Sequence, residues 1–474
     1  MIPNRLNKFF ILIVCIGFVF VFSSCDNSLK EGTIICTQLA ENHESNSLNI
    51  QNYLNYFSNA KIVAFNAEKQ SGFAQILTEE FFSACAPSIS FDGESMVFSG
   101  QKNKNDVWQI WEMNLTNLKI NGITNSSENC FDPAYLPNGT VVFSKRKTTN
   151  VEDNFYALFT CKLDGTDLMQ ITYNPNQKFG SSILRDGRIL TISSQIYPEN
   201  QAPIFVVLRP DGTKEELFYK SEFNATIVSS GIETSEEKIV FIESDSENKG
   251  SIVSINYNRP FHSYENLSSG ISGYFNSVYP ITHEKFIVTY RTSSKETFAL
   301  YEFNPVTKLL GNKIYKDEKN NLVQAVVVLK KERPKKLPSE IILKNETGLL
   351  VSQNINFLDI KDIANKQSIA IAEKVEIEGM KNYREVIDVE EDGSFYIKVP
   401  ANTPFRIKTL DKNGNIVKGP SGWIYLRPNE RRGCIGCHED KEQSPENVQP
   451  LAVRKEPISI FVQKKENNQI KVDF

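Results

Sequence analysis

Hydrophobic and polar positions between residues 50 and 330 follow one pattern, a strand, a tight turn and a second strand, which recurs along the chain. Alternating apolar and polar residues over four to eight positions indicate half-buried strands. Asp-Gly and Asn-Gly suit the turn between antiparallel strands because both tolerate positive φ. The turns of five copies lie at residues 92–93, 138–139, 186–187, 236–237 and 283–284. Their spacing of 46 to 50 residues is the period of a four-stranded propeller blade.

Each copy is followed by a third strand, a polar turn and a short fourth strand. A sixth blade is expected to be shared between residues 61–65 and 322–329, which would close the ring. The sequence therefore predicts an all-β fold in which residues 50–330 form a β-propeller of six blades, or of seven. The copies resemble the TolB-type propeller repeat.

Two further segments follow the repeats. Residues 331–340 are rich in Lys and Pro, which predicts an extended linker. Contact of its basic residues with anionic lipid or an acidic partner is the alternative to a solvated linker. Alternating runs with turn pairs at 392–393 and 413–414 then predict a small β-sandwich over residues 341–428.

The N-terminus has the pattern of a secretory signal. Arg5 and Lys8 precede a 14-residue apolar run, which is too short for a comfortable membrane span. Two serines then precede Cys25, which resembles a bacterial lipobox. We expect residues 1–24 to be a lipoprotein signal peptide, Cys25 to be lipidated, and residues 25–49 to be a tether. Ordinary signal cleavage is the alternative.

These features predict an extracytoplasmic lipoprotein anchored in a membrane, on the periplasmic face or in the outer membrane. The net charge of −4 gives no electrostatic reason to expect nucleic-acid binding. In an oxidising compartment, four further cysteines could form disulfides or stay as buried thiols, and the sequence leaves both open. These are Cys36, Cys85, Cys130 and Cys161.

The segment 429–474 carries the strongest chemical motif, Cys434-x-x-Cys437-His438. Cys-x-x-Cys-His is the attachment signature of a c-type haem. The two thiols form thioethers with one porphyrin edge, and the imidazole is placed to ligate the iron. A structural zinc site would need further ligands, and a thioredoxin-like pair needs no trailing His. A plain disulfide or a vestigial motif remains the alternative to one covalent haem c.

The tail after the motif is short and contains two prolines, so it cannot bury a haem as a separate cytochrome domain would. The sandwich is therefore expected to supply part of the haem pocket. Trp423 and Tyr425, just before the motif, are the aromatic residues expected to line it. Packing in the sandwich core is the alternative for both.

The stretches 132–139, 392–395, 400–406 and 423–439 resemble proteins related to the hydrazine synthase alpha subunit. That resemblance implies a propeller followed by a middle domain with one c-type haem held by Cys434, Cys437 and His438. Two departures argue against hydrazine synthesis itself. The family enzyme has a further haem domain and partner subunits, and a tyrosine shortly after its motif is thought to ligate the iron, where this chain has Glu442.

Two classes of function follow from these patterns. The first is a membrane-tethered redox protein whose single haem transfers electrons or acts on a small molecule, as a haem-dependent oxidoreductase would. The second is a non-catalytic binding or assembly lipoprotein, whose propeller recognises a partner and whose haem is structural or absent. In both, the N-terminal lipid contacts the membrane and the propeller is the surface for a redox or protein partner.

Overall fold

A computed structural model describes residues 28–40, 57–65, 74–147, 155–221, 225–356, 371–380, 383–434 and 447–461. These ranges contain eight β-sheets and the short 3₁₀ helix η3 (Leu451–Arg454). Among them, no helix has the length and apolar character needed to cross a bilayer. The all-β prediction is confirmed.

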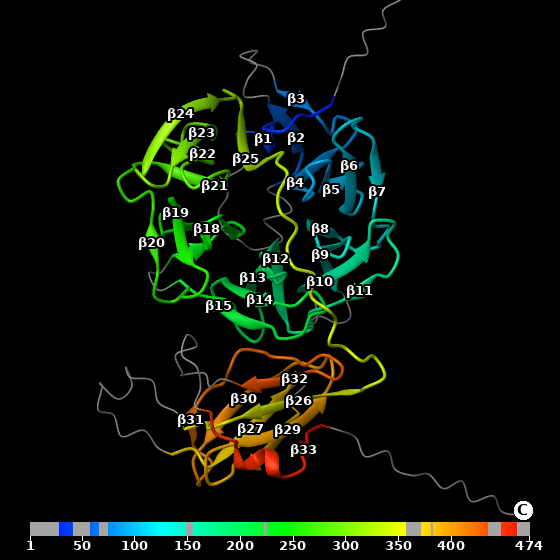
Figure 1. The fold of residues 1–474 in the computed structure, drawn as a ribbon, viewed down its shortest axis with the longest axis vertical. Helices are drawn as coiled ribbons and strands as arrows, with labels where there is room; N and C mark the ends of the chain where they lie inside the picture. Colours follow the sequence, from blue (N-terminus) through cyan, green and yellow to red (C-terminus); the bar gives the residue numbers. More distant parts are fainter. Residues whose placement is uncertain are drawn as a thin grey trace, which may run out of the picture.

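Six of the sheets in the described ranges surround a common centre as the blades of a propeller (Figure 1). Neighbouring strands within each blade are antiparallel. From the centre outward, five blades consist of β4 (Ser83–Ile89), β5 (Ser95–Gln101), β6 (Gln109–Asn114) and β7 (Ile120–Gly122); β8 (Cys130–Tyr135), β9 (Thr140–Lys147), β10 (Phe155–Lys162) and β11 (Met169–Gln170); β12 (Asn176–Ile183), β13 (Ile189–Gln195), β14 (Ile204–Leu208) and β15 (Glu216–Tyr219); β16 (Thr226–Ile227) and β17 (Ile232–Glu233), both paired with β18 (Lys238–Ser244), then β19 (Gly250–Asn256) and β20 (Glu265–Asn266); and β21 (Tyr274–Pro280), β22 (Phe286–Arg291), β23 (Ala299–Asn304) and β24 (Leu309–Tyr315).

The remaining blade closes the ring from both ends of the propeller sequence. Its order is β25 (Asn320–Val327), β1 (Ile34–Ala40), β2 (Lys61–Phe65) and β3 (Gln75–Ile76). The expected sharing of one sheet by residues 61–65 and 322–329 is confirmed, but β1 lies between them. The prediction that residues 25–49 are a tether is therefore wrong for Ile34–Ala40, where the apolar side chains are buried in the closing blade.

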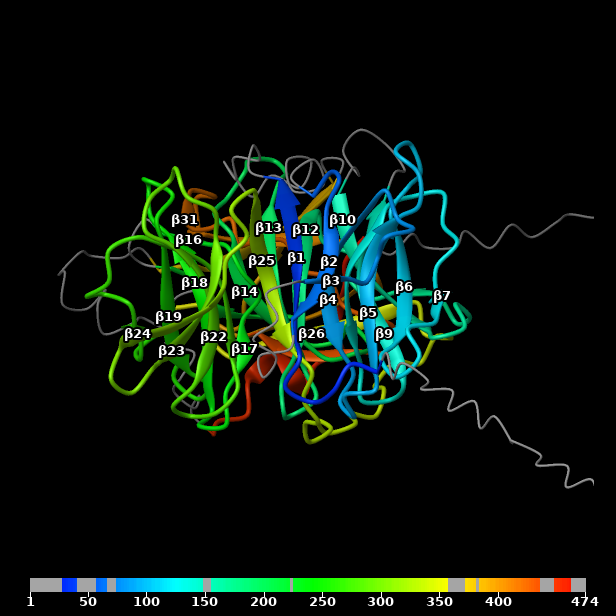
Figure 2. The ribbon, with the colours of Figure 1, turned by 90° about the horizontal axis from the view of Figure 1, so that it is seen from above.

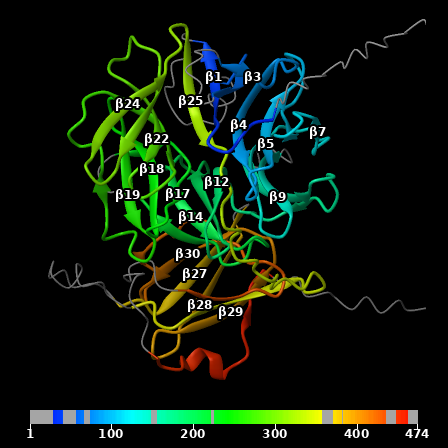
Figure 3. The ribbon, with the colours of Figure 1, turned by 45° about the horizontal axis from the view of Figure 1, so that its top comes forward.

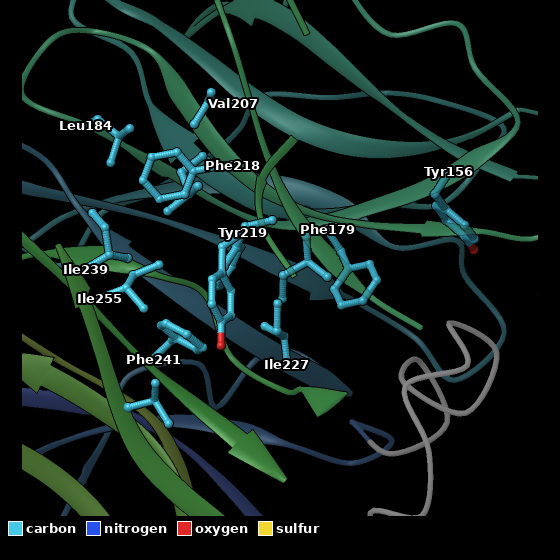
Figure 4. Close-up of a cluster of buried hydrophobic side chains, with 14 of the residues drawn as sticks. Tyr156, Phe179, Leu184, Val207, Phe218, Tyr219, Ile227, Ile239, Phe241 and Ile255 are labelled. Carbon is cyan, nitrogen blue, oxygen red and sulfur yellow. The ribbon is translucent and has the colours of Figure 1, made fainter. Parts of the chain in front are cut away.

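Apolar side chains pack between neighbouring blades. One large cluster joins the blades that contain β8, β12 and β18, and Figure 4 shows its aromatic residues Phe179, Tyr219 and Phe241 facing one another. Phe205 and Phe241 make an edge-to-face contact with 4.9 Å between ring centroids. Because burying each such side chain contributes about 1.5–3 kcal/mol, these seams between blades hold the ring together.

The predicted turn glycines all lie on one face of the propeller. Gly93, Gly139 and Gly187 have φ values of 76°, 85° and 90°, which L side chains rarely adopt. They connect the first and second strands of three successive blades, so the turns lie at the same end of the ring. We call this end the strap face.

Residues 330–340 cross the strap face as an extended segment, seen in yellow over the ring in Figure 1. We call this segment the strap. The Lys331 amide donates to Phe91 O at 2.8 Å, the Lys335 amide to Arg185 O at 3.0 Å, and the Glu340 amide to the Asp211 carboxylate at 2.7 Å. The linker is extended as predicted, but the expectation that it is simply solvated is wrong, since three blades hold its backbone.

The strap lies over a central cavity of about 2180 Å³. The cavity is lined by residues of the inner strands β4, β8, β12, β16, β21 and β25, and at one end by residues 331–335 of the strap. Figure 2 shows the inner strands running side by side along this axis. The strap therefore covers one mouth of the central channel.

The second domain is the predicted β-sandwich, with two four-stranded sheets packed face to face. One has the order β32 (Arg431–Cys434), β26 (Thr347–Ser352), β29 (Phe395–Pro400) and β33 (Ile458–Ser459); the other has β28 (Arg384–Asp388), β27 (Lys374–Gly379), β30 (Phe405–Leu410) and β31 (Ile416–Lys418). Both sheets contribute to one core, including Leu350, Ile377, Ile397 and Phe405. Figure 3 shows the sandwich against the side of the ring.

The second sheet of the sandwich carries a charged cluster on its outer face. Arg406 donates to both carboxylate oxygens of Glu378, at 3.0 and 3.1 Å, and Lys408 lies 2.8 Å from the same carboxylate. The hydrogen bonds from Arg406, and then from Lys408, lower the pKa of Glu378 from 4.5 to about 2. Ionised Glu378 is thus favoured by the folded state.

This cluster predicts an acid-sensitive sandwich. Because the pKa of Glu378 is lower in the folded state, its stabilisation is present above the unfolded pKa near 4.5 and is lost as the pH falls toward 2. Glu378→Gln is expected to remove on the order of 3 kcal/mol at neutral pH and much less at pH 2. Urea denaturation across this pH range measures the difference. An exposed control, Glu391→Gln, should change little, and equal effects of both variants would contradict the assignment.

Candidate haem-attachment site

The last strand before the motif is part of the sandwich. β32 runs parallel to β26, with Ser352 opposite Cys434. The Cys434 side chain is half-buried and packs against the sandwich core. Cys437, His438 and Glu442 lie outside the described residues. The one described residue of the motif is thus held at the end of a paired strand.

The chain after the motif rejoins the same sheet. The amides of Leu451 and Ala452 donate to the side chains of Asp392 and Ser394, at 2.8 and 3.0 Å. β33 then pairs with β29, at the edge of the sheet opposite β32. The predicted boundary at residue 428 is therefore a correction to make, because both ends of the segment 429–461 belong to the sandwich.

The described cysteines differ in their exposure. Cys36, Cys85, Cys130 and Cys161 are buried free thiols, so their pairing, left open by the sequence, does not occur in the structure. Burial raises the pKa of all four, to about 11 for Cys130 and about 12 for Cys161. Of the cysteines within the described ranges, Cys434 alone is not buried. Since thioether formation needs an accessible thiol, Cys434 fits covalent attachment of a haem.

Trp423 and Tyr425 face the propeller, and their assignment to the haem pocket is corrected here. The Trp423 indole donates to Tyr197 O at 2.8 Å, in the loop between β13 and β14. The Tyr425 hydroxyl lies 3.0 Å from Gly212 O and 3.1 Å from a carboxylate oxygen of Glu215. Both side chains are buried between the two domains. Their proximity to the motif in sequence did not reveal the direction in which they point.

A buried charged network joins β32 to the propeller. The Glu430 side chain is fully buried, and one of its oxygens accepts from Arg432 at 2.6 and 2.9 Å and from the Lys214 amide at 2.7 Å. The other oxygen accepts from the Arg427 amide at 2.7 Å. Arg432 also donates to Glu215 O at 3.3 Å. The strand that carries Cys434 is thereby tied to the blade containing β12–β15.

The network continues inside that blade. Lys178 is fully buried and donates to Glu215 at 2.6 Å, and the Tyr425 hydroxyl reaches the other Glu215 oxygen. Burial lowers the pKa of Lys178 and raises the pKa of Tyr425 well above its usual value. The sequence analysis missed Lys178, Glu215 and Glu430, because charged residues give no local signal that they are buried.

No group of three or more His, Cys, Asp or Glu side chains suited to a metal ion occurs within the described ranges. The chemistry that these ranges support is therefore presentation of one accessible thiol on a rigid strand. The charged network beside it fixes the position of β32 and offers no separate catalytic set.

Comparison with known proteins places this geometry. Residues 357–439 match the family model of the hydrazine synthase alpha subunit middle domain. The hydrazine synthase subunit alpha of Kuenenia stuttgartiensis is 23% identical over 82% of this chain and 64% of its own length. The chain is related to the hydrazine synthase alpha subunit. It spans about two thirds of that relative's length, and the matched middle domain ends at Glu439, just past the motif.

Solved structures agree on the fold. Hydrazine synthase from Kuenenia stuttgartiensis matches 90% of this chain and 72% of its own, with a TM-score of 0.77 and 21% identity. TolB from Acinetobacter baumannii matches 64% of this chain and 67% of its own, with a TM-score of 0.46 and 12% identity. The expected relationship to the hydrazine synthase alpha subunit, with its propeller and middle domain, is confirmed.

Proposed function

We propose that this protein is an extracytoplasmic, membrane-tethered lipoprotein that carries one covalent c-type haem and acts in electron transfer or small-molecule redox chemistry. The observation that carries the proposal is the accessible Cys434 thiol at the end of β32, at the start of a Cys-x-x-Cys-His motif. The relationship to the hydrazine synthase alpha subunit supports it.

The residues have distinct roles in this proposal. Cys434 and Cys437 would hold the haem through thioethers, and His438 would ligate the iron. The bound haem would supply one-electron redox chemistry. Pairing of β32 with β26 fixes the first attachment point, and the Glu430–Arg432 pair keeps that strand against the propeller. We do not extend the proposal to hydrazine synthesis, because Glu442 replaces the family's tyrosine.

The central cavity favours a second candidate. Its volume of about 2180 Å³ exceeds the few hundred to 1,000 Å³ of ordinary small-molecule sites. A propeller with such a channel suits a binding or assembly lipoprotein, in which the haem is structural or absent. A haem that changes oxidation state reversibly with physiological donors would favour the redox proposal over this one.

Cys434→Ala tests the attachment site. With Cys437 left to form the remaining thioether, we expect the pyridine haemochrome band to shift to the position of a single thioether. The double variant Cys434→Ala/Cys437→Ala should carry no covalent haem after denaturation. Gly433→Ala is the matched control, since a Cβ there meets no atom within 4 Å, and it should keep the wild-type band. An unchanged band in Cys434→Ala would contradict the assignment.

Lipidation predicts a second result. Cys25→Ala should release the protein from the membrane fraction or leave an uncleaved precursor, because acyl chains are the proposed anchor. Cell fractionation and the intact mass of the mature protein measure both outcomes. A wild-type protein found wholly in the soluble fraction would refute the tether.

A further inference from the structure

The first described residues and the strap lie at the same end of the propeller. The Leu29 amide donates to Leu115 O at 2.8 Å, in the turn between β6 and β7. The Gly32 amide donates to Val328 O at 2.8 Å, next to the start of the strap. Since the β6–β7 turn and the turn at Gly93 share one end of their blade, the chain enters the propeller on the strap face.

This entry point restricts the orientation of a lipidated protein. Only three peptide units separate Cys25 from Ser28, where the described chain begins. Three extended residues span at most about 10 Å. If Cys25 bears the lipid, the rim of the strap face therefore lies within about 10 Å of the bilayer.

The strap places basic side chains over the middle of that face. It contains five Lys or Arg residues and one Glu up to residue 336, in a chain whose net charge is −4. All six charged side chains are exposed. The surrounding turns carry both signs, including Asp92 and Glu94 as well as Lys30 and Arg185. The excess positive charge on this face therefore comes from the strap.

Contacts with the blades hold two of these cations in place. The Lys331 ammonium lies 4.3 Å from the centre of the Tyr279 ring, and Arg333 donates to Pro137 O at 3.4 Å. Directly after the strap, Ile342 and Leu343 are exposed by 49% and 76%. Basic residues beside exposed apolar ones are typical of surfaces that meet lipid headgroups.

We propose that the strap face is a membrane-docking surface, on which the basic strap contacts anionic lipid headgroups beside the N-terminal lipid. The proposal rests on the lipidation proposed above for its geometry, and on the strap for its charge. A lipid chain and a basic patch together give the two attachments that stable membrane binding needs. In this orientation the covered mouth of the channel faces the bilayer, and the opposite mouth is left for a soluble partner.

Vesicle binding tests the charge contribution separately from the lipid. The full-length Cys25→Ser protein, which cannot be acylated, is mixed with vesicles of neutral lipid or of neutral lipid containing phosphatidylglycerol. We expect binding only to the anionic vesicles, weakened by salt. Lys331→Glu/Lys335→Glu should reduce it about tenfold or more, since each basic residue near an anionic surface contributes about 1 kcal/mol.

The matched control reverses the same number of charges at the opposite mouth. Lys249 and Lys295 are exposed in turns at the other end of the blades, and Lys249→Glu/Lys295→Glu should leave binding unchanged. Equal losses from both pairs, no dependence on anionic lipid, or binding to an acidic protein but not to vesicles would overturn the proposal.

Orientation is tested in cells with the acylated protein. A photoreactive amino acid at residue 335 should crosslink to lipid, and one at residue 295 should not. The reverse pattern would overturn the proposal while leaving lipidation intact. Failure of lipidation alone would instead give a soluble wild-type protein whose unacylated form still binds anionic vesicles through the strap.

Discussion

Replacing Glu430 with alanine is expected to cost about 3–5 kcal/mol of stability, because it removes one partner of a buried ion pair. Both carboxylate oxygens of Glu430 are in use, accepting from Arg432 and from the Lys214 and Arg427 amides. Alanine would leave the Arg432 guanidinium, whose side chain is only 12% exposed, without its carboxylate. The sandwich should then separate from the propeller before either domain unfolds.

Urea denaturation followed by tryptophan fluorescence measures this effect, since Trp423 lies in the interface. Glu390→Ala is the control, because Glu390 pairs with Lys455, whose side chain is 67% exposed. Exposed pairs contribute about 0–1 kcal/mol. If Glu430→Ala were no more destabilising than Glu390→Ala, the buried network would not hold the domains together.

Gly187→Ala is the second change with a large expected effect. A Cβ at Gly187 would lie 2.0 Å from Lys335 O, and the residue has a φ of 90°. Relief of this clash requires the strap to move, which would break the hydrogen bond from Lys335 to Arg185. We expect a loss of about 3 kcal/mol, the sum of the positive-φ cost and one hydrogen bond. Trypsin should cleave the displaced strap faster at its lysines.

Gly139→Ala separates the two contributions. Gly139 occupies the same turn in the neighbouring blade with a φ of 85°, and a Cβ there meets no atom within 4 Å. This variant should lose only about 1–2 kcal/mol for the backbone strain and should keep the strap protected. Equal stability and equal cleavage of the two variants would mean that the strap does not rest on the turn at Gly187.

The features that the sequence predicted well are those with a local or repeated pattern. Asp92-Gly93, Asn138-Gly139 and Asp186-Gly187 announced hairpin turns because positive φ requires such residues, and their regular spacing predicted the blades. The alternating runs after residue 341 likewise predicted the sandwich.

The features that it predicted poorly depend on distant partners. Ile34–Ala40 pairs with β25, almost 300 residues later, and nothing near it distinguishes a strand from a tether. The strap is held by its backbone, which leaves no pattern in its side chains. Trp423 and Tyr425 lie close to the motif in sequence, but the docking of the propeller decides which way they face.

The central claim is a covalent haem on the segment that begins at Cys434. The measurement that tests it most directly is the pyridine haemochrome spectrum of the denatured full-length protein, produced in a host with the c-type haem maturation machinery. The account predicts one haem per chain that stays bound after denaturation and gives the band of two thioethers. A colourless chain, from a host shown to mature another c-type cytochrome, would contradict it.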